Sequence, residues 1–182
     1  RTRSSDLRTL LDGPSLRTFV LRDAGTIVAV VLVADEGGLP ADLAQAIADG
    51  KRRPHGHVLP QSLAVHLNVT EALQRRSWRI VRIAVHSQAR RQGLGRLCLE
   101  QLQAQAQTED VALLGSLFAA SADVLAFWQA CDFTAVRVGI TPEATSGAYP
   151  VLVVQAVDTD GMALVQQARR RFEQTFLSGL PD

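Results

Sequence analysis

Hydrophobic and polar positions divide the chain into segments with strand-like and helix-like periodicity. Alternating positions or β-branched apolar runs predict strands at residues 15–23, 26–34, 77–86, 111–118, 133–139 and 148–157. Apolar residues at helical spacing predict helices at residues 4–11, 39–50, 61–68, 93–107 and 122–131, and a last one from residue 158 towards the C-terminus. Residues 51–60, KRRPHGHVLP, are expected to form a loop.

The order of these segments predicts the fold class. A hairpin comes first and helices follow; strand, helix, strand and helix then alternate before two closing strands. This order is typical of an α/β protein whose sheet has mixed strand direction and helices on both faces. With 182 residues, no internal repeat and no dividing linker, residues 1–182 are expected to form a single domain.

Composition narrows the class of protein further. The longest apolar run, residues 26–34, is too short to span a membrane, and the two cysteines form neither a disulfide framework nor a zinc pattern. We therefore expect a cytoplasmic protein. The chain begins at Arg1 without an initiator methionine, so we expect it to be a fragment of a longer protein.

Basic residues gather in clumps although the net charge is only +1. The clumps lie at residues 51–53, 75–82, 90–96 and 169–171. We interpret the last clump as a solvated helix face. The first three all fall within residues 51–96, a concentration that favours contact with a polyanion.

A basic turn with two glycines, RRQGLGR at residues 90–96, lies between the strand at 77–86 and the helix after it. Successive backbone N–H groups at such a turn are unpaired, and the helix N-terminus adds partial positive charge, so the segment predicts an anion-binding site. Gly93 and Gly95 would let a phosphate approach the backbone. Neither G-x-G-x-x-G nor G-x-x-x-x-G-K-[ST] occurs, which argues against a dinucleotide-binding fold and a P-loop NTPase.

The strand, the R/Q-x-x-G-x-G/A turn and the helix together resemble the acetyl-CoA-binding motif of the GCN5-related N-acetyltransferases (GNAT). The resemblance implies a mostly antiparallel GNAT-like sheet in which the strand before the turn splays from its neighbour. It implies that the pantetheine arm is lined by Ile83, Ala84 and Val85. It also implies that the pyrophosphate is surrounded by Arg90, Arg91, Gln92, Gly93, Leu94, Gly95 and Arg96. Asp123 falls in the family's second cofactor segment, where it would bind the cofactor or cap its helix.

Longer stretches resemble a narrower family, the bacterial tRNA(Met) cytidine acetyltransferases. These stretches are residues 35–39, 50–66, 82–86, 127–133 and 143–149, and RRPHGHVLPQSLA is the most specific part. The resemblance covers essentially the whole chain. It implies transfer of an acetyl group from acetyl-CoA to N4 of the wobble cytidine of elongator tRNA(Met). ATP is used in that family by an N-terminal helicase-like module, whose nucleotide-binding motif this sequence lacks.

Candidate catalytic groups follow from this resemblance. The cytosine amine needs placement and a base as the C–N bond forms, and His86 is the candidate base because imidazole titrates near neutral pH. The alternative is a structural hydrogen bond from His86. Many GNAT enzymes place a tyrosine acid in F-Y-x-x-x-G-F; this chain has FWQACDF, with Trp128 at that position. The Val85 N–H is the candidate donor to the thioester oxygen.

The candidate contacts to the tRNA backbone are Arg52, Arg53, Arg75 and Arg76. His55 and His57 form an H-x-H pair with no evident third ligand, so we expect no metal site and a role in shaping the loop or stacking near RNA. Two alternatives stay open. One is a GNAT enzyme for a protein or small-molecule amine, which would be expected to carry an acidic pocket. The other is a non-catalytic module that binds acyl-CoA or tRNA.

Overall fold

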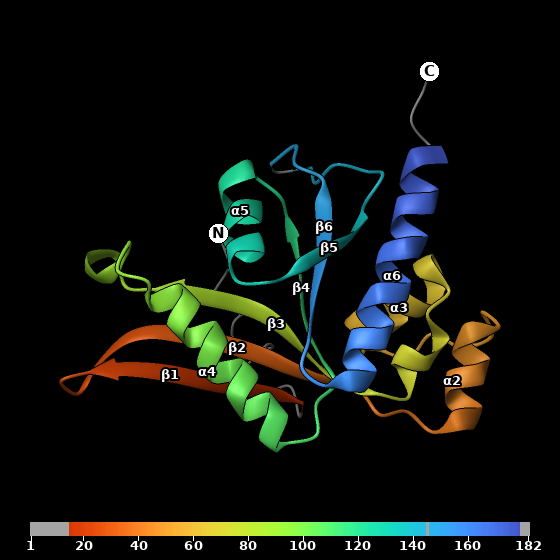
Figure 1. Ribbon diagram of the computed structural model, residues 1–182, viewed down its shortest axis with the longest axis horizontal. Helices are drawn as coiled ribbons and strands as arrows, with labels where there is room; N and C mark the ends of the chain where they lie inside the picture. The colour runs from red at the N-terminus through yellow and green to blue at the C-terminus, as the bar shows by residue number, and fades with distance from the viewer. Residues whose placement is uncertain (1–14, 145, 179–182) are drawn as a thin grey trace.

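A computed structural model describes residues 15–144 and 146–178 of the chain (Figure 1). The helix predicted at residues 4–11 lies outside this range. The strands are β1 (Leu16–Asp23), β2 (Thr26–Gly37), β3 (Arg76–Val85), β4 (Leu113–Ala119), β5 (Thr134–Val138) and β6 (Pro150–Ala156). The α-helices are α2 (Ala41–Ala48), α3 (Val58–Leu67), α4 (Leu94–Thr108), α5 (Ala122–Ala130) and α6 (Thr159–Ser178). The short 3-10 helices η1 (Thr70–Leu73) and η2 (Ser87–Ala89) were not predicted.

The six strands form one sheet in the order β1-β2-β3-β4-β6-β5. Among the described strands only β3 and β4 pair in parallel; every other neighbouring pair is antiparallel. The predicted fold class, a mixed and mostly antiparallel α/β sheet, is therefore confirmed. No helix in the described part of the chain is both long and apolar enough to cross a membrane.

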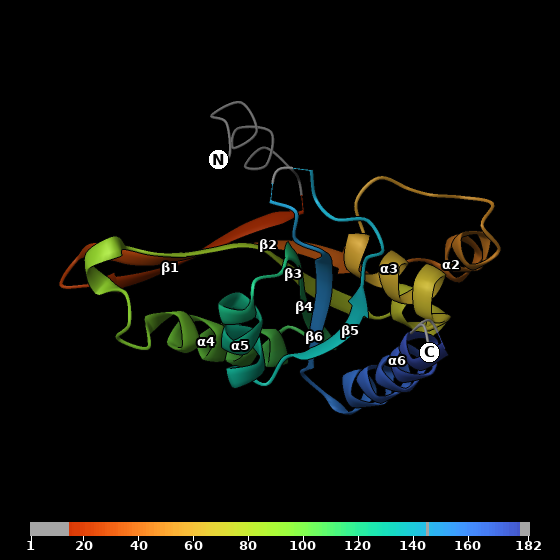
Figure 2. The same cartoon turned by 90° about the horizontal axis from the view of Figure 1, so that it is seen from above.

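Helices cover both faces of the sheet, also as predicted. Alternate residues of β4 show this: Leu114 belongs to a core with α4 and α5, whereas Leu113 belongs to a core with α3 and α6. This alternation is the two-residue period of a strand that is buried on both faces. Figure 2 shows α4 beside α5, while α2, α3 and α6 gather at the other end of the molecule.

Helix α3 begins at Val58, three residues before the predicted start at residue 61, inside the segment expected to be a loop. Pro60 is compatible with this because the first turn of a helix needs no N–H from its own residues. The N–H of Leu59 donates to the buried carboxylate of Glu36, 2.7 Å away, on β2. A side chain 23 positions away in sequence thus satisfies this helix end, which no local pattern could indicate.

Candidate active site

Strands β3 and β4 pair only from Ser77 to Ile80 on β3 and from Leu113 to Ser116 on β4. Both strands continue beyond these residues, β3 to Val85 and β4 to Ala119, but they no longer pair with each other. Figure 1 shows them diverging from a common end near the base of α6. The Ser116 hydroxyl donates to the Ile80 carbonyl (2.9 Å) at the last paired position and closes that end of the split.

A β-bulge lies at the closed end of this split. On β2, Val33 pairs with Ile80 and Leu32 pairs with Arg82, so Val81 has no partner in the register. A bulge adds one residue to a strand, bends it and re-aims the backbone groups beside it. Here it lies where β3 turns away from β4.

Beyond the bulge, β3 directs backbone groups into the split. The His86 N–H donates to the Val28 carbonyl of β2 (2.8 Å). In an antiparallel pair every second residue bonds to the same neighbour, so Ala84 also directs its backbone groups to β2. Ile83 and Val85 direct theirs into the split. Such an edge can pair with an extended ligand that carries amide groups.

The turn between β3 and α4 contains two residues in the left-handed region, Arg91 (φ 61°) and Gly93 (φ 77°). Gly93 occupies the N-cap position of α4, and no atom lies within 4 Å of where its Cβ would be. An open approach to the first N–H groups of a fifteen-residue helix suits an anion. The turn, β3 and α5 enclose a hollow of about 330 Å³.

Residues predicted to bind the cofactor meet in this hollow. Its lining includes the predicted Ile83, Val85, Arg90, Arg91, Gly93, Leu94, Gly95 and Arg96. Ala84, Gln92 and Asp123 do not line it. Asp123 lies exposed in the first turn of α5, and the residue that caps this helix is Ser121, whose Oγ accepts from the Val124 N–H (3.4 Å).

Phe127 of α5 completes the hollow, a contribution that local patterns in the sequence did not predict. A Cβ at Gly95 would lie 3.3 Å from the Phe127 ring, so this glycine allows α4 and α5 to approach each other. Gly93 is the glycine that leaves open space. Trp128, next along α5, is 4% exposed and packs against Phe118 and Phe133 in the core.

His86 lies exposed at the turn end of β3. It lies six positions after Ile80, and at about 3.3 Å per residue the two are about 20 Å apart along the strand. His86 is therefore close to the basic turn and far from the closed end of the split. Its role as a base stays a prediction.

A second hollow, of about 490 Å³, lies on the α3 face of the sheet. We call it the 53–66 pocket; it is lined by Arg53, Pro54, His55, Gly56, Val58, Gln61, Ser62, Val65, His66 and Arg79. Burial, and then the guanidinium groups of Arg137 and Arg53, lower the pKa of His66. No carboxylate is part of this lining.

Two side chains fix the loop that forms one wall of the 53–66 pocket. The Gln61 side-chain amide donates to the carbonyls of Pro54 (3.1 Å) and Gly56 (2.6 Å). His57, left-handed at φ 49°, accepts at Nδ1 from the Gly37 N–H (2.9 Å). The expectation that this histidine shapes the loop is confirmed by that contact.

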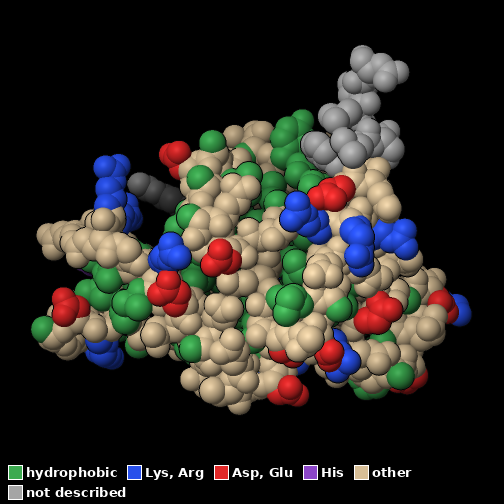
Figure 3. All heavy atoms as spheres, viewed as in Figure 1, with side chains coloured by type: hydrophobic (Ala, Val, Ile, Leu, Met, Phe, Trp, Pro, Cys, Tyr) green, Lys and Arg blue, Asp and Glu red, His purple; other side chains and the backbone are tan. Residues whose placement is uncertain are grey.

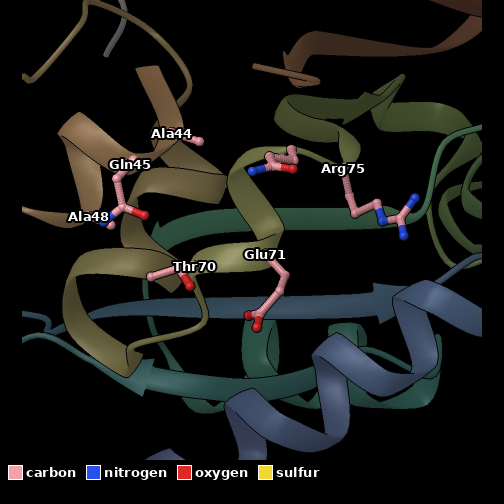
Figure 4. A pocket seen from close by; sticks show the side chains of 7 residues that line it. Ala44, Gln45, Ala48, Thr70, Glu71 and Arg75 are labelled. Atoms are coloured by element: carbon pink, nitrogen blue, oxygen red, sulfur yellow. The ribbon is translucent and has the colours of Figure 1, made fainter. Parts of the chain in front are cut away.

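Of the residues predicted to contact RNA, Arg52 and Arg53 are exposed. Arg75 lies at a different hollow, between α2 and η1, where Figure 4 shows it pointing away from Glu71; it pairs with Asp160 (2.9 Å). Figure 3 shows a further basic group at the left end of the molecule, where β3 turns into α4.

Arg76, also predicted to contact RNA, makes several hydrogen bonds within the fold. Its guanidinium binds the Asp35 carboxylate through Nε and Nη2, and its Nη1 donates to the Glu109 carbonyl (2.7 Å). These contacts join β2 and β3 to the end of α4. Because they use the charge within the fold, Arg76 is not part of the RNA surface proposed below.

Both cysteines, Cys98 and Cys131, are buried and free, and burial raises the pKa of each thiol. Within residues 15–144 and 146–178, no three His, Cys, Asp or Glu side chains are grouped so as to hold a metal ion.

Comparison with known sequences gives a consistent result. Residues 1–109 match the profile of the family described as GNAT acetyltransferase 2. The curated relatives include proteins named tRNA(Met) cytidine acetyltransferase TmcA from Nitrosococcus halophilus (44% identical over 94% of this chain) and Thermococcus kodakarensis (32% over the whole chain). The chain covers only 23% and 22% of the length of these two relatives.

Solved structures share the fold at low identity. The ribosomal-protein-S18-alanine N-acetyltransferase from Escherichia coli has a TM-score of 0.56 at 18% identity, over 86% of this chain and 79% of that one. A GNAT family acetyltransferase from Elizabethkingia anophelis with acetyl-CoA bound has a TM-score of 0.54 at 13% identity, over 85% of this chain and 83% of that one.

Proposed function

Because the chain belongs to the GNAT acetyltransferase 2 family, we propose that it transfers an acetyl group from acetyl-CoA to N4 of the wobble cytidine of elongator tRNA(Met), forming N4-acetylcytidine. The single observation that carries the proposal is the split between β3 and β4, which opens at the glycine turn before α4. The names of the curated relatives support the choice of tRNA as acceptor.

The residues of the split fit the chemical groups of acetyl-CoA. Gly93 and the N–H groups at the start of α4 would bind the pyrophosphate, with Arg90, Arg91 and Arg96 adding charge. The backbone groups of Ile83 and the N–H of Val85 would pair with the amides of the pantetheine arm, while the Val85 carbonyl accepts from Nε of Arg90 (3.3 Å). When bound, the cofactor supplies an activated acetyl thioester.

The direction of the split supports chemistry at its closed end. An arm that is held by its phosphates at the turn runs along β3 towards Ile80. The bulge at Val81 is therefore better placed than Val85 to present a backbone donor to the thioester oxygen. By the same geometry His86 is nearer to the phosphates, so a contribution to cofactor binding is the alternative to its predicted role as base.

The charge of the 53–66 pocket favours RNA over a cationic amine. An alkylammonium substrate would need a carboxylate in the pocket, and the lining supplies arginines and histidines instead. The exposed Arg52 and Arg53 are suited to phosphate contacts that position the tRNA without reading its sequence. The target base would have to be unstacked so that its Watson–Crick edge enters the pocket.

Mass spectrometry of tRNA nucleosides tests the proposal. The complete gene product is incubated with acetyl-CoA and elongator tRNA(Met), with ATP present or omitted because the predicted helicase-like module would use it. We expect N4-acetylcytidine, and none in a transcript whose wobble cytidine is replaced by uridine. Acetylation of proteins or polyamines in place of tRNA would contradict the proposal.

A further inference from the structure

The 53–66 pocket reaches the sheet at Arg79, next to the closed end of the split. Arg79 pairs with Gly115 of β4, one residue before the last paired position. Its side chain lies on the α3 face, whereas the hollow beside the glycine turn is lined by residues that pack towards α4 and α5. A ligand in the 53–66 pocket and a thioester in the split would therefore approach the same gap from opposite faces.

The guanidinium of Arg79 is bound through Nε, and among the described residues its two terminal nitrogens are free. Its Nε donates to Oε1 of Glu36 (2.8 Å), while Oε2 of the same carboxylate accepts from the Leu59 N–H (2.7 Å). The Glu36 side chain is 3% exposed and that of Arg79 is 19% exposed. In the described part of the chain, neither terminal nitrogen of Arg79 has a hydrogen-bond partner.

We propose that Arg79, fixed by Glu36, recognises the acceptor cytosine by donating from its two terminal nitrogens to O2 and N3 of the base. This proposal rests on the proposed function. A guanidinium presents two parallel donors, which match two adjacent acceptors on a base edge. The N4 amine, beside N3, would then be directed towards the split.

The charge of the pair selects a base edge over a phosphate at this position. Glu36 already neutralises Arg79, and its buried carboxylate would repel a phosphate placed against the same guanidinium. A neutral base with two acceptors meets no such repulsion. Arg53, on the exposed loop of the same pocket, forms no salt bridge within the described residues and is the side chain suited to the phosphates.

The same geometry distinguishes cytosine from uracil. Uracil carries an N–H at position 3, which would point a donor at the donors of Arg79. A site that is built to bond two acceptors rejects an analogue that lacks one, because buried polar groups are then left unpaired. The identity of the acceptor base is therefore set at Arg79.

The test compares acetyl transfer to two anticodon stem-loops, one with cytidine and one with 3-deazacytidine at the target position. Replacing N3 by C–H removes one acceptor and leaves the phosphates unchanged. We expect the wild-type protein to lose about 10- to 100-fold in kcat/KM on 3-deazacytidine. In Arg79→Gln, the ratio of kcat/KM on cytidine to kcat/KM on 3-deazacytidine should fall to about 1. The intrinsic reactivity of the analogue cancels because both proteins meet the same two substrates.

Arg53→Gln is the matched control in the same pocket, and it should weaken transfer to both stem-loops equally. An unchanged 3-deazacytidine ratio in Arg79→Gln would overturn the proposal while leaving the proposed function intact. If the wild-type protein acetylates neither stem-loop nor tRNA, the proposed function fails and this proposal fails with it.

A second variant controls for the effect of an unpaired buried charge on folding. Arg79→Gln leaves the buried Glu36 carboxylate without its counterion, which destabilises the fold. We therefore compare this variant with the double variant Glu36→Gln/Arg79→Gln, which removes both charges. Both variants should still bind CoA in a calorimetric titration, because neither residue lines the hollow at the glycine turn. The neutral pair should show the same loss of the 3-deazacytidine ratio as the single variant, and retention of that ratio would contradict the proposal.

Discussion

The Glu109 carboxylate, at the end of α4, accepts from both terminal nitrogens of Arg17 (2.5 and 2.7 Å) and from the Gln105 amide (2.9 Å). These hydrogen bonds, that of Arg17 first, lower the pKa of Glu109 from 4.5 to about 2. The contact joins β1 to α4 and lies beside Arg76, away from both hollows. Titration of Glu109 should therefore change the stability of the protein without changing either hollow.

A depressed pKa gives stability that is present above the unfolded-state value of 4.5 and is lost as pH falls through the folded-state value of about 2. Glu109→Gln should therefore be less stable than the wild type at pH 7, and the difference should shrink between these two pH values. Urea unfolding at a series of pH values measures it. Glu173→Gln, which breaks an exposed pair with Arg169, is the control and should change little. A constant difference down to pH 2 would contradict the assignment.

Helix α3 packs closely against β4 at Gly115. A Cβ at Gly115 would lie 2.8 Å from both Leu59 methyl groups and 3.1 Å from the Val153 carbonyl oxygen. Leu59 is fully buried, so it has little room to move away. The absence of a side chain at Gly115 thus sets how closely α3 and the 53–66 pocket approach the split.

We expect Gly115→Ala to cost about 1–3 kcal/mol of unfolding free energy, since the added methyl overpacks this contact. Leu59→Ala removes the clashing groups, so the double variant should be less destabilised than the sum of the two single variants. Chemical denaturation of all four proteins gives this coupling. Strict additivity would show that Gly115 and Leu59 do not constrain each other.

The elements that local patterns predicted are those whose signals lie within one segment. The strand at 77–86, the turn at Gly93 and the helix after it follow from apolar alternation, left-handed glycine and helical spacing, and the structure has all three. The start of α3 depends on Glu36, which only the fold brings to Leu59. Local reasoning therefore could not place it.

The same distinction applies to the site. The basic turn was predictable because its residues are contiguous. The bulge at Val81 depends on the register between β2 and β3, the contribution of Phe127 depends on the packing of α5, and the free nitrogens of Arg79 depend on a partner 43 positions away. For Arg76 the composition suggested RNA contact, and only the structure shows that Asp35 uses its charge.

Across the molecule, the two hollows lie on opposite faces of one sheet: one is beside the glycine turn, at the open end of the split, and the other reaches Arg79, near its closed end. In the proposed function, this arrangement separates the end of the sheet that binds the cofactor from the surface that binds RNA. Binding of tRNA to the proposed RNA surface should depend on salt, since each phosphate that a basic side chain neutralises releases counterions.

For tRNA binding, the logarithm of the association constant falls with the logarithm of the salt concentration. We expect the slope of this dependence to be less steep by about 1 in Arg53→Gln than in the wild type. Arg22→Gln, at the β1–β2 hairpin, should leave the slope unchanged. Fluorescence anisotropy across a salt series measures both. An Arg53→Gln slope equal to that of the wild type would remove Arg53 from the proposed RNA surface.

We propose that the left-handed glycine before α4 opens the backbone to the diphosphate of the cofactor. Calorimetric titration of CoA into wild type, Gly93→Val and Gly25→Val tests this role of Gly93. Gly25, in the β1–β2 hairpin, has a similar φ (85° against 77°) and equally open surroundings, so the two variants carry similar backbone strain. We predict that Gly25→Val binds CoA like the wild type and that Gly93→Val loses at least tenfold in affinity. Equal affinity of the two variants for CoA would contradict the claim.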